Sequence, residues 1–147
     1  MPQNSETGSI IVLAALIRER ANARISEALA GFGVTDILPA HGAVLRALFQ
    51  RGSMPMSALA SAIGRKKNTV TSLINTLEAL GYCRREAHGQ DARVQLVALT
   101  DKGEAMRDIQ AKVSAELLHR VWAGIPEREG RACIETLRAV LRNLESN

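Results

Sequence analysis

Small polar and basic side chains are concentrated in one stretch, GRKKNTVTSLINTLEALGY, which occupies residues 64–82. Three consecutive cations stand near its start, and no acidic residue occurs between Gly64 and Leu77. Its hydroxyl and amide groups can donate and accept hydrogen bonds at base edges, while its cations can bind phosphates. These residue types therefore predict recognition of a nucleic acid. The candidate residues are Lys66, Lys67, Asn68, Thr69, Thr71, Ser72 and Asn75.

The net charge of +4 is concentrated in the middle of the 147-residue chain. Residues 51–93 contain seven Lys or Arg and three Asp or Glu, whereas residues 1–50 and 94–147 are each balanced. A positive surplus confined to one segment is typical of a surface that binds a polyanion. A charged face that meets only solvent would be spread more evenly. The charge distribution therefore favours a nucleic acid as the partner.

The elements that must position these residues follow from apolar spacing and from helix-breaking residues. We expect helices at about 9–31, 39–51, 56–63, 66–80, 101–123 and 126–145. Two runs that suit β-strands, 82–87 and 93–100, flank the turn sequence HGQD and predict a hairpin. Pro39 suits the first turn of its helix, and Thr100 suits the cap of the helix after the hairpin.

The helix expected at 66–80 has one apolar face and one small polar face. The apolar residues recur every three or four positions and should be buried: Val70, Leu73, Leu77 and Leu80, with Ile74 beside them. The opposite face carries Asn68, Thr71, Ser72 and Asn75. A helix face that only meets solvent would favour Glu, Lys and Ala, because Thr, Ser and Asn are weaker helix formers. We therefore expect this face to contact bases or phosphates.

Two short helices joined by a glycine-containing turn and followed by a basic hairpin describe a winged helix-turn-helix. The fold class expected is mainly α with a small β-hairpin wing, as a single domain over 1–147 with the winged region at 36–100. A helix that enters the major groove must bury one side on its own domain and offer hydrogen-bonding groups on the other. The helix at 66–80 meets both requirements.

A series of short motifs runs through the winged region into the helix that follows it: Leu59-Ala60, Thr69-Val70-Thr71, Leu77-Glu78, Gly81, Arg85, Asp91 with Arg93, and Leu99-Thr100 with Gly103. In these motifs the sequence resembles the MarR family of bacterial transcriptional regulators. The resemblance implies a homodimeric, repressor-type regulator that binds an inverted repeat in double-stranded DNA. It implies dimerisation helices at 9–31 and 101–145, flanking the winged region. It also implies that a small-molecule effector can change the DNA affinity; the sequence leaves that effector open, with His41 and Arg46 as candidate contacts.

A second set of candidate contacts lies on the wing and at the DNA backbone. These residues are Arg65, Arg85, His88, Gln90, Asp91 and Arg93. Asp91 and Arg93 resemble the pair that shapes the wing, whereas His88 either touches DNA or serves only in the turn. Ala92 departs from the family pattern, because many relatives carry a second arginine there. Lys66 stands where a capping Ser or Thr is usual, and Gly42 where a large apolar residue is common.

Other classes of function find little support in the sequence. Cys83, Cys133 and the three histidines lack metal-binding spacing, and no catalytic motif is present, so we expect no metal, no cofactor and no enzymatic activity. The apolar run IIVLAALI is too short to span a bilayer, which favours a cytoplasmic protein with reduced cysteines. Cys83 is interpreted as a packed small residue in preference to a reactive thiol. The alternative function is a winged helix that binds other proteins without reading DNA sequence.

Overall fold

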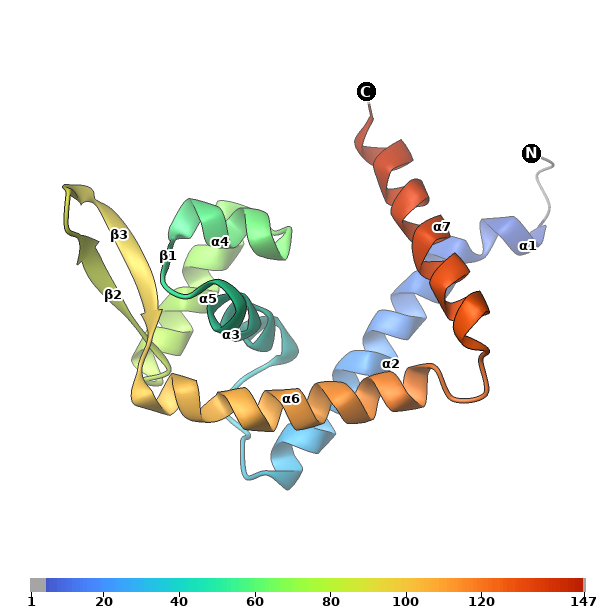
Figure 1. The fold of residues 1–147 in the computed structure, drawn as a ribbon, viewed down its shortest axis with the longest axis horizontal. Helices are drawn as coiled ribbons and strands as arrows, with labels where there is room; N and C mark the ends of the chain where they lie inside the picture. Colours follow the sequence, from blue (N-terminus) through green and yellow to red (C-terminus); the bar gives the residue numbers. More distant parts are fainter. Residues whose placement is uncertain (1–4, 147) are drawn as a thin grey trace. The chain divides into compact units, whose positions relative to one another are not determined.

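The computed structural model describes residues 5–146, which form a mainly helical chain with one small antiparallel sheet (Figure 1). The helices are α1 (Ser5–Gly8), α2 (Ile10–Gly31), α3 (Pro39–Arg51), α4 (Met56–Ile63), α5 (Lys67–Ala79), α6 (Asp101–Val121) and α7 (Glu127–Glu145). The strands are β1 (Met54–Pro55), β2 (Cys83–His88) and β3 (Asp91–Leu99). The sequence predicted the long helices and the hairpin correctly, but it gave no sign of β1 or of the separate turn of α1.

The helices α3, α4 and α5 pack around a common aliphatic core. Fully buried side chains come from all three, including Leu45 on α3, Leu59 on α4 and Ile74 on α5. The predicted inner face of α5 needs one correction, since Leu73 and Leu80 are only half-buried while Ile74 is at the centre of the core. The burial of Val70, Ile74 and Leu77 fixes which face of α5 remains outside.

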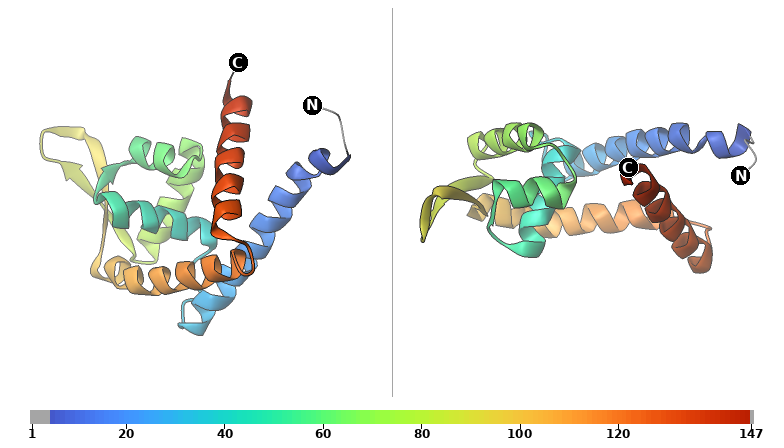
Figure 2. Two further views of the ribbon diagram at one scale, coloured as in Figure 1. Left: turned by 45° about the vertical axis from the view of Figure 1, so that its right-hand side comes forward. Right: turned by 90° about the horizontal axis from the view of Figure 1, so that it is seen from above.

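The three strands form a sheet in the order β1-β3-β2, and the hairpin β2–β3 extends beyond the helices (Figure 2). The pairing of β2 with β3 runs from Cys83 opposite Leu99 to His88 opposite Asp91, with an irregularity between Ala87 and His88. At the other edge, β1 pairs Met54 with Val97. Because β1 precedes α4 directly, this pairing ties the base of the wing to the start of the helix-turn-helix.

The junction between the hairpin and α6 is closed by Thr100. Its hydroxyl accepts a hydrogen bond from the backbone N–H of Gly103 at 3.1 Å, which confirms the predicted cap. The same hydroxyl donates to the backbone carbonyl of Gly81 at the end of α5. The Thr100 side chain therefore joins the end of α5 to the first turn of α6.

Backbone contacts divide the chain into two compact units, and the division falls inside α6 after Ser114. The first unit contains the winged region predicted at 36–100. In the second unit, Trp122 packs against Gly130, where an added Cβ would lie 3.2 Å from the indole ring. Each unit is described by itself below.

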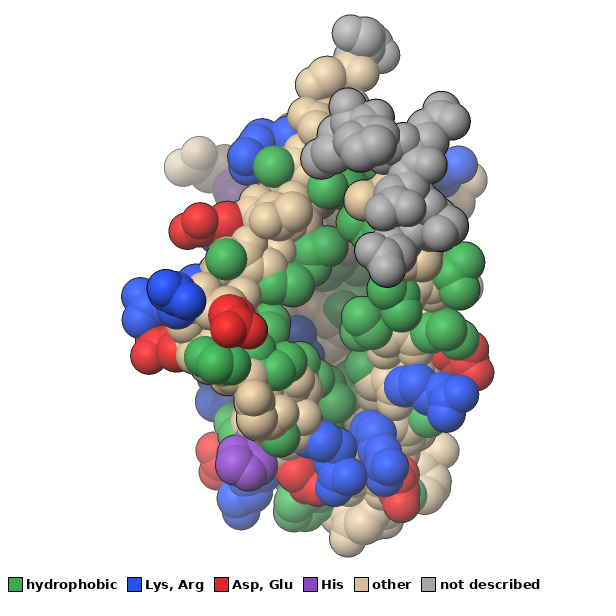
Figure 3. All heavy atoms as spheres, turned by 90° about the vertical axis from the view of Figure 1, so that its right-hand side faces the viewer, with side chains coloured by type: hydrophobic (Ala, Val, Ile, Leu, Met, Phe, Trp, Pro, Cys, Tyr) green, Lys and Arg blue, Asp and Glu red, His purple; other side chains and the backbone are tan. Residues whose placement is uncertain are grey.

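Large apolar side chains are exposed on α2 and on α7, and they appear green in Figure 3. On α2 they are Ile11, Val12, Leu13, Leu16 and Ile17, and on α7 they are Ile134, Leu137, Leu141 and Leu144. These side chains are not covered within the single chain, in which Leu13 is 52% exposed and Leu141 is 57% exposed.

Candidate nucleic-acid interface

The start of α5 presents the run of cations that the sequence singled out. Gly64 ends α4 with a left-handed backbone (φ 64°), and the N–H of Arg65 donates to the Ala60 carbonyl at 3.1 Å. Lys66 is the N-cap residue of α5 and its side chain makes no capping hydrogen bond. Arg65, Lys66 and Lys67 are all exposed. The turn between the two helices therefore places three positive charges together at the surface.

The outer face of α5 consists of small polar side chains. Asn68, Thr69, Ser72 and Asn75 are exposed, and Thr71 is half-buried. The Thr71 hydroxyl donates to the Lys67 carbonyl at 2.9 Å, so only its acceptor lone pairs stay available to a partner. The expectation that this face points outward therefore holds fully for Asn68, Ser72 and Asn75 and partly for Thr71.

Thr76 belongs to the same face, although sequence reasoning did not select it. It is exposed, and its hydroxyl donates to the Ser72 carbonyl at 3.2 Å. Its position four residues after Ser72, on the same side of a helix, was the signal that could have identified it.

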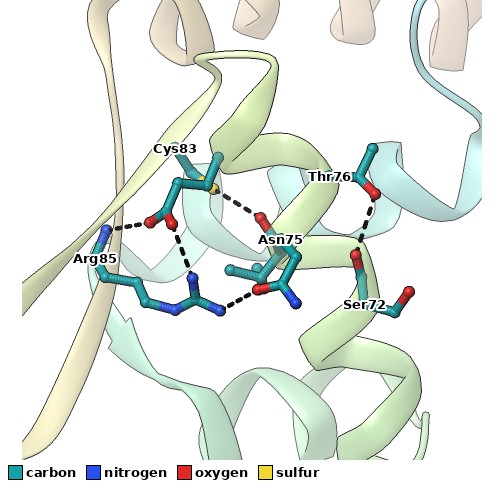
Figure 4. Close-up of polar contacts among 7 residues, drawn as sticks. Ser72, Asn75, Thr76, Cys83 and Arg85 are labelled. Carbon is teal, nitrogen blue, oxygen red and sulfur yellow. Dashed lines mark hydrogen bonds and ion pairs between the residues drawn. The ribbon is translucent and has the colours of Figure 1, made fainter.

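Asn75 and Arg85 are joined by a hydrogen bond, which Figure 4 shows between α5 and β2. The Arg85 guanidinium donates through Nη2 to Asn75 Oδ1 at 2.6 Å and through Nη1 to Glu78 Oε1 at 2.9 Å. The backbone N–H of Arg85 donates to the other carboxylate oxygen of Glu78 at 3.1 Å. Arg85, expected at the DNA backbone, is thus engaged with two side chains of α5 and is 23% exposed.

The tip of the wing is shaped by local hydrogen bonds from two of the predicted residues. Asp91 Oδ1 accepts from the backbone N–H of Arg93 at 3.0 Å, and His88 Nδ1 accepts from the N–H of Gln90 at 3.4 Å. The side chains of His88, Gln90, Asp91 and Arg93 are exposed. The Asp91 bond agrees with the wing-shaping role that the resemblance implied, and it leaves the Arg93 guanidinium at the surface.

Arg84 is the outward-facing neighbour of Arg85 on β2. It donates through Nη1 to the Leu99 carbonyl at 2.7 Å and lies 3.7 Å from a carboxylate oxygen of Glu86. These contacts are separate from those of Asn75, so the two adjacent arginines have different surroundings.

Cys83 is buried beneath α5 at the start of β2, with 2% of its surface exposed. Burial, reinforced by the nearby Glu78 carboxylate and opposed by Arg85, raises the pKa of its thiol to about 11. A thiol with so high a pKa is a poor nucleophile near neutral pH. The structure therefore agrees with the interpretation of Cys83 as a packed residue.

The candidate effector contacts on α3 do not come together. His41 is 6% exposed and its Nδ1 accepts a hydrogen bond from the Leu38 N–H at 2.9 Å, whereas Arg46 is exposed. Gly42 packs against α6, where an added Cβ would lie 3.1 Å from Gln110 Nε2. A methyl group at position 42 would therefore fit only if the end of the Gln110 side chain moved by a few tenths of an ångström.

Two kinds of site are missing from the described residues 5–146. No group of three or more His, Cys, Asp or Glu side chains is placed to hold a metal ion there. In that same part of the chain, no helix has the length and apolar character needed to cross a bilayer.

Comparison with known proteins relates this geometry to transcriptional regulators. The model of the MarR family matches residues 38–94. The HTH-type transcriptional regulator YkoM of Bacillus subtilis (strain 168) is 30% identical over 100 residues, which are 68% of this chain. The matched segment spans 65% of YkoM, slightly under two thirds of its length.

Solved structures agree over most of the chain. A MarR-family transcriptional regulator from Silicibacter pomeroyi is 27% identical, with a TM-score of 0.69 over 89% of this chain and 86% of its own. BpsR of Bordetella bronchiseptica, a protein whose DNA binding is regulated by 6-hydroxynicotinic acid, shares the fold. Its TM-score is 0.77 at 21% identity, over 90% of this chain and 98% of its own.

Proposed function

Because this chain belongs to the MarR family of transcriptional regulators, we propose that it is a sequence-specific DNA-binding regulator of the repressor type. The observation that supports this proposal is the outer face of α5, where exposed hydroxyl and amide side chains adjoin three exposed cations without any acid from Gly64 to Leu77. Such a face can enter the major groove of double-stranded DNA, since it offers donors and acceptors to bases and charge to phosphates.

We assign two kinds of DNA contact to the predicted residues. Base edges are read by the small polar side chains of α5: Asn68, Thr69, Thr71, Ser72 and Asn75. Phosphates are bound by Arg65, Lys66 and Lys67 at the start of α5, which supply affinity that does not depend on sequence. On the wing, the free guanidinium of Arg93 contacts the adjacent backbone or minor groove. Asp91, His88 and Gln90 hold the loop that presents it.

The exposed apolar side chains of α2 and α7 support a homodimer. Runs of exposed apolar side chains along a helix, as on each of these two, are uncommon on a monomer and usually mark an interface. A second copy would bury the same side chains in both protomers through a two-fold axis. The two copies of α5, which serve as the recognition helices of such a dimer, would read an inverted repeat with half-sites about one DNA turn apart.

A small-molecule effector is the third part of the proposal. BpsR, which shares the fold, gives a precedent in its regulation by 6-hydroxynicotinic acid. The chemistry of the effector of this chain is open, because His41 and Arg46 do not form a common site.

Family membership favours a regulator over an enzyme, and a DNA partner favours the cytoplasm as its location.

The alternative function, a winged helix that binds other proteins, would require an apolar patch on α5. The outer face of α5 instead carries polar side chains, and the exposed apolar patches lie on α2 and α7.

Selection of bound duplexes from a random pool tests the proposal with the full-length protein. The selection is run at about 50 mM and about 200 mM salt, because phosphate contacts weaken steeply over that range. We expect an inverted repeat to be enriched at both concentrations. Enrichment of no sequence at either one, with binding that depends on salt alone, would refute sequence-specific regulation.

A further inference from the structure

We propose that Arg85 engages the amide oxygen of Asn75, so that Asn75 reads bases through its N–H donors and prefers a keto base, guanine or thymine, over adenine and cytosine. The inference rests on the proposed function, since it assumes that α5 lies in the major groove. It assigns Arg85 a role different from the phosphate contact that the sequence suggested: a positioning residue that acts on base choice through Asn75.

The orientation of the Asn75 amide follows from its partner. A guanidinium carries only donors, so the atom that faces Arg85 Nη2 at 2.6 Å must be the amide oxygen. The amide nitrogen then points away from Arg85 (Figure 4), and the Asn75 residue is exposed. In most asparagines the two ends of the amide can exchange at little cost; here the exchange would place N–H groups against N–H groups.

Arg85 is itself held in place by Glu78. The carboxylate of Glu78 accepts from Nη1 of the guanidinium at 2.9 Å and from the Arg85 backbone N–H at 3.1 Å. Asn75 and Glu78 are three residues apart and therefore lie on one side of α5, where a single planar guanidinium can reach both. The Arg85 side chain is 23% exposed, so water screens these contacts only in part.

The orientation decides which bases can be bound. An asparagine that recognises adenine normally uses both ends of its amide, since the oxygen accepts from N6 and the nitrogen donates to N7. Arg85 Nη2 occupies one of the two lone pairs of the Asn75 oxygen, and the guanidinium stands beside the other, so the N–H donors are the groups that Asn75 offers most freely. Guanine presents two acceptors, O6 and N7, and thymine presents O4, whereas adenine presents only N7, beside its N6 amino group, and cytosine presents its N4 amino group. Asn75 should therefore discriminate keto from amino bases.

Base preference at the contacted position is the measurement, made by selection from a random duplex pool. Asn75→Ala first identifies that position, because it should lose its preference while the rest of the repeat is kept. Wild-type protein should prefer guanine or thymine over adenine there by about tenfold, as expected for a good base contact. Arg85→Met keeps the aliphatic stem but frees the Asn75 amide, and it should reduce this preference to about twofold or less.

Arg84→Met is the matched control, since it removes the same charge from the neighbouring residue without touching Asn75. It should leave the preference at that position unchanged. A loss of the preference in both variants would indicate an effect of charge or of wing stability, and it would overturn the inference.

Asn75→Asp supplies a second variant of the same shape at an exposed position, so the test does not depend on Arg85→Met folding well. An aspartate paired with Arg85 presents only acceptors outward, and it should change the preferred base from keto to amino, above all to cytosine. An unchanged keto preference would contradict the inference. Selection of no sequence by wild-type protein would instead refute the proposed function, so the two failures can be told apart.

Discussion

Gly103 lies so close to the backbone of Tyr82 that a Cβ added to Gly103 would be 2.0 Å from the Tyr82 carbonyl oxygen. That carbonyl accepts a hydrogen bond from the Thr100 N–H at 3.2 Å, and so it cannot move away freely. The first turn of α6 is therefore packed directly on the residue that precedes β2. This contact gives the glycine of the L-T-x-x-G motif a steric role.

Replacement of this glycine should destabilise the fold. We expect Gly103→Ala to lower the free energy of unfolding by about 1–3 kcal/mol, because the backbone of Tyr82 or α6 must shift to admit a methyl group. Gly31→Ala is the control, since a Cβ at Gly31 meets no atom within 4 Å. Urea unfolding of both variants measures the difference. Equal stability of Gly103→Ala and the wild-type protein would contradict the packing described here.

A second prediction concerns pH and the buried His41. Burial lowers the pKa of His41, and the Asp36 carboxylate partly opposes this shift. The unfolded chain therefore binds a proton more readily than the folded one, so the free energy of unfolding should fall as the pH drops below about 6.5. His41→Asn keeps an acceptor for the Leu38 N–H but does not titrate, and it should flatten this dependence.

Urea unfolding at about pH 5.5 and about pH 7.5 measures the effect, since the two values bracket the usual histidine pKa. The exposed His119 on α6 provides a control, and His119→Asn should keep the wild-type slope between the two pH values. If His41→Asn and the wild-type protein lose equal stability on acidification, another group is responsible.

The sequence predicted the fold well because its signals are local. Helical periodicity placed α3, α4 and α5, and Gly64 and Gly81 both adopt the positive φ expected where a helix ends. The sequence did not predict the two-residue strand β1, because a strand so short has no periodicity and forms only by pairing with β3. The packing of Gly42 against Gln110 could not be predicted from the sequence either, because it depends on how α6 packs against α3 in the folded chain.

The candidate interface was predictable in composition but not in connectivity. Residue type and spacing predicted that Asn75 lies on the outer face of α5. The structure shows that Asn75 is exposed there. Nothing local in the sequence indicated that Arg85, ten residues later, would form a hydrogen bond with Asn75 across the turn between α5 and β2. The same limit applies to the exposed faces of α2 and α7, whose apolar periodicity does not state which chain covers them.

A third prediction separates charge from base recognition on α5. Lys67 is exposed at the start of the helix, where its ammonium can reach a phosphate. Lys67→Ala should weaken binding to specific and random duplex alike, and it should reduce the slope of log affinity against log salt by about one unit. Lys112→Ala removes an equal charge from α6, outside the basic segment, and should leave that slope unchanged.

The base-reading residues should behave in the opposite way to Lys67. Thr71→Ala or Asn75→Ala removes no charge, so the salt dependence should stay near the wild-type value. Binding to the selected repeat should fall by more than binding to random duplex, by about five- to tenfold if one base contact is lost. Fluorescence anisotropy titrations with both duplexes measure the difference. Equal losses on the two duplexes would rule out a base-reading role for these side chains.

The last prediction concerns α7, whose exposed apolar residues form one stripe. Ile134, Leu137, Leu141 and Leu144 follow one another at steps of three or four, and each is at least 36% exposed. Carboxylates placed in a buried two-fold interface would face their own copies, and the cost of burying unpaired charge should prevent association. We therefore expect the double variant Leu137→Glu/Leu141→Glu to be a folded monomer.

Sedimentation equilibrium and helical content by circular dichroism measure association and folding separately. Leu38→Glu is the control, because Leu38 is 63% exposed but precedes α3, away from α2 and α7 in sequence, and this variant should remain dimeric. The monomeric variant should bind a single half-site as weakly as the wild-type protein does, and it should gain no affinity from a second half-site, since avidity requires both recognition helices in one particle. A double variant that remains dimeric would show that α7 does not form the interface.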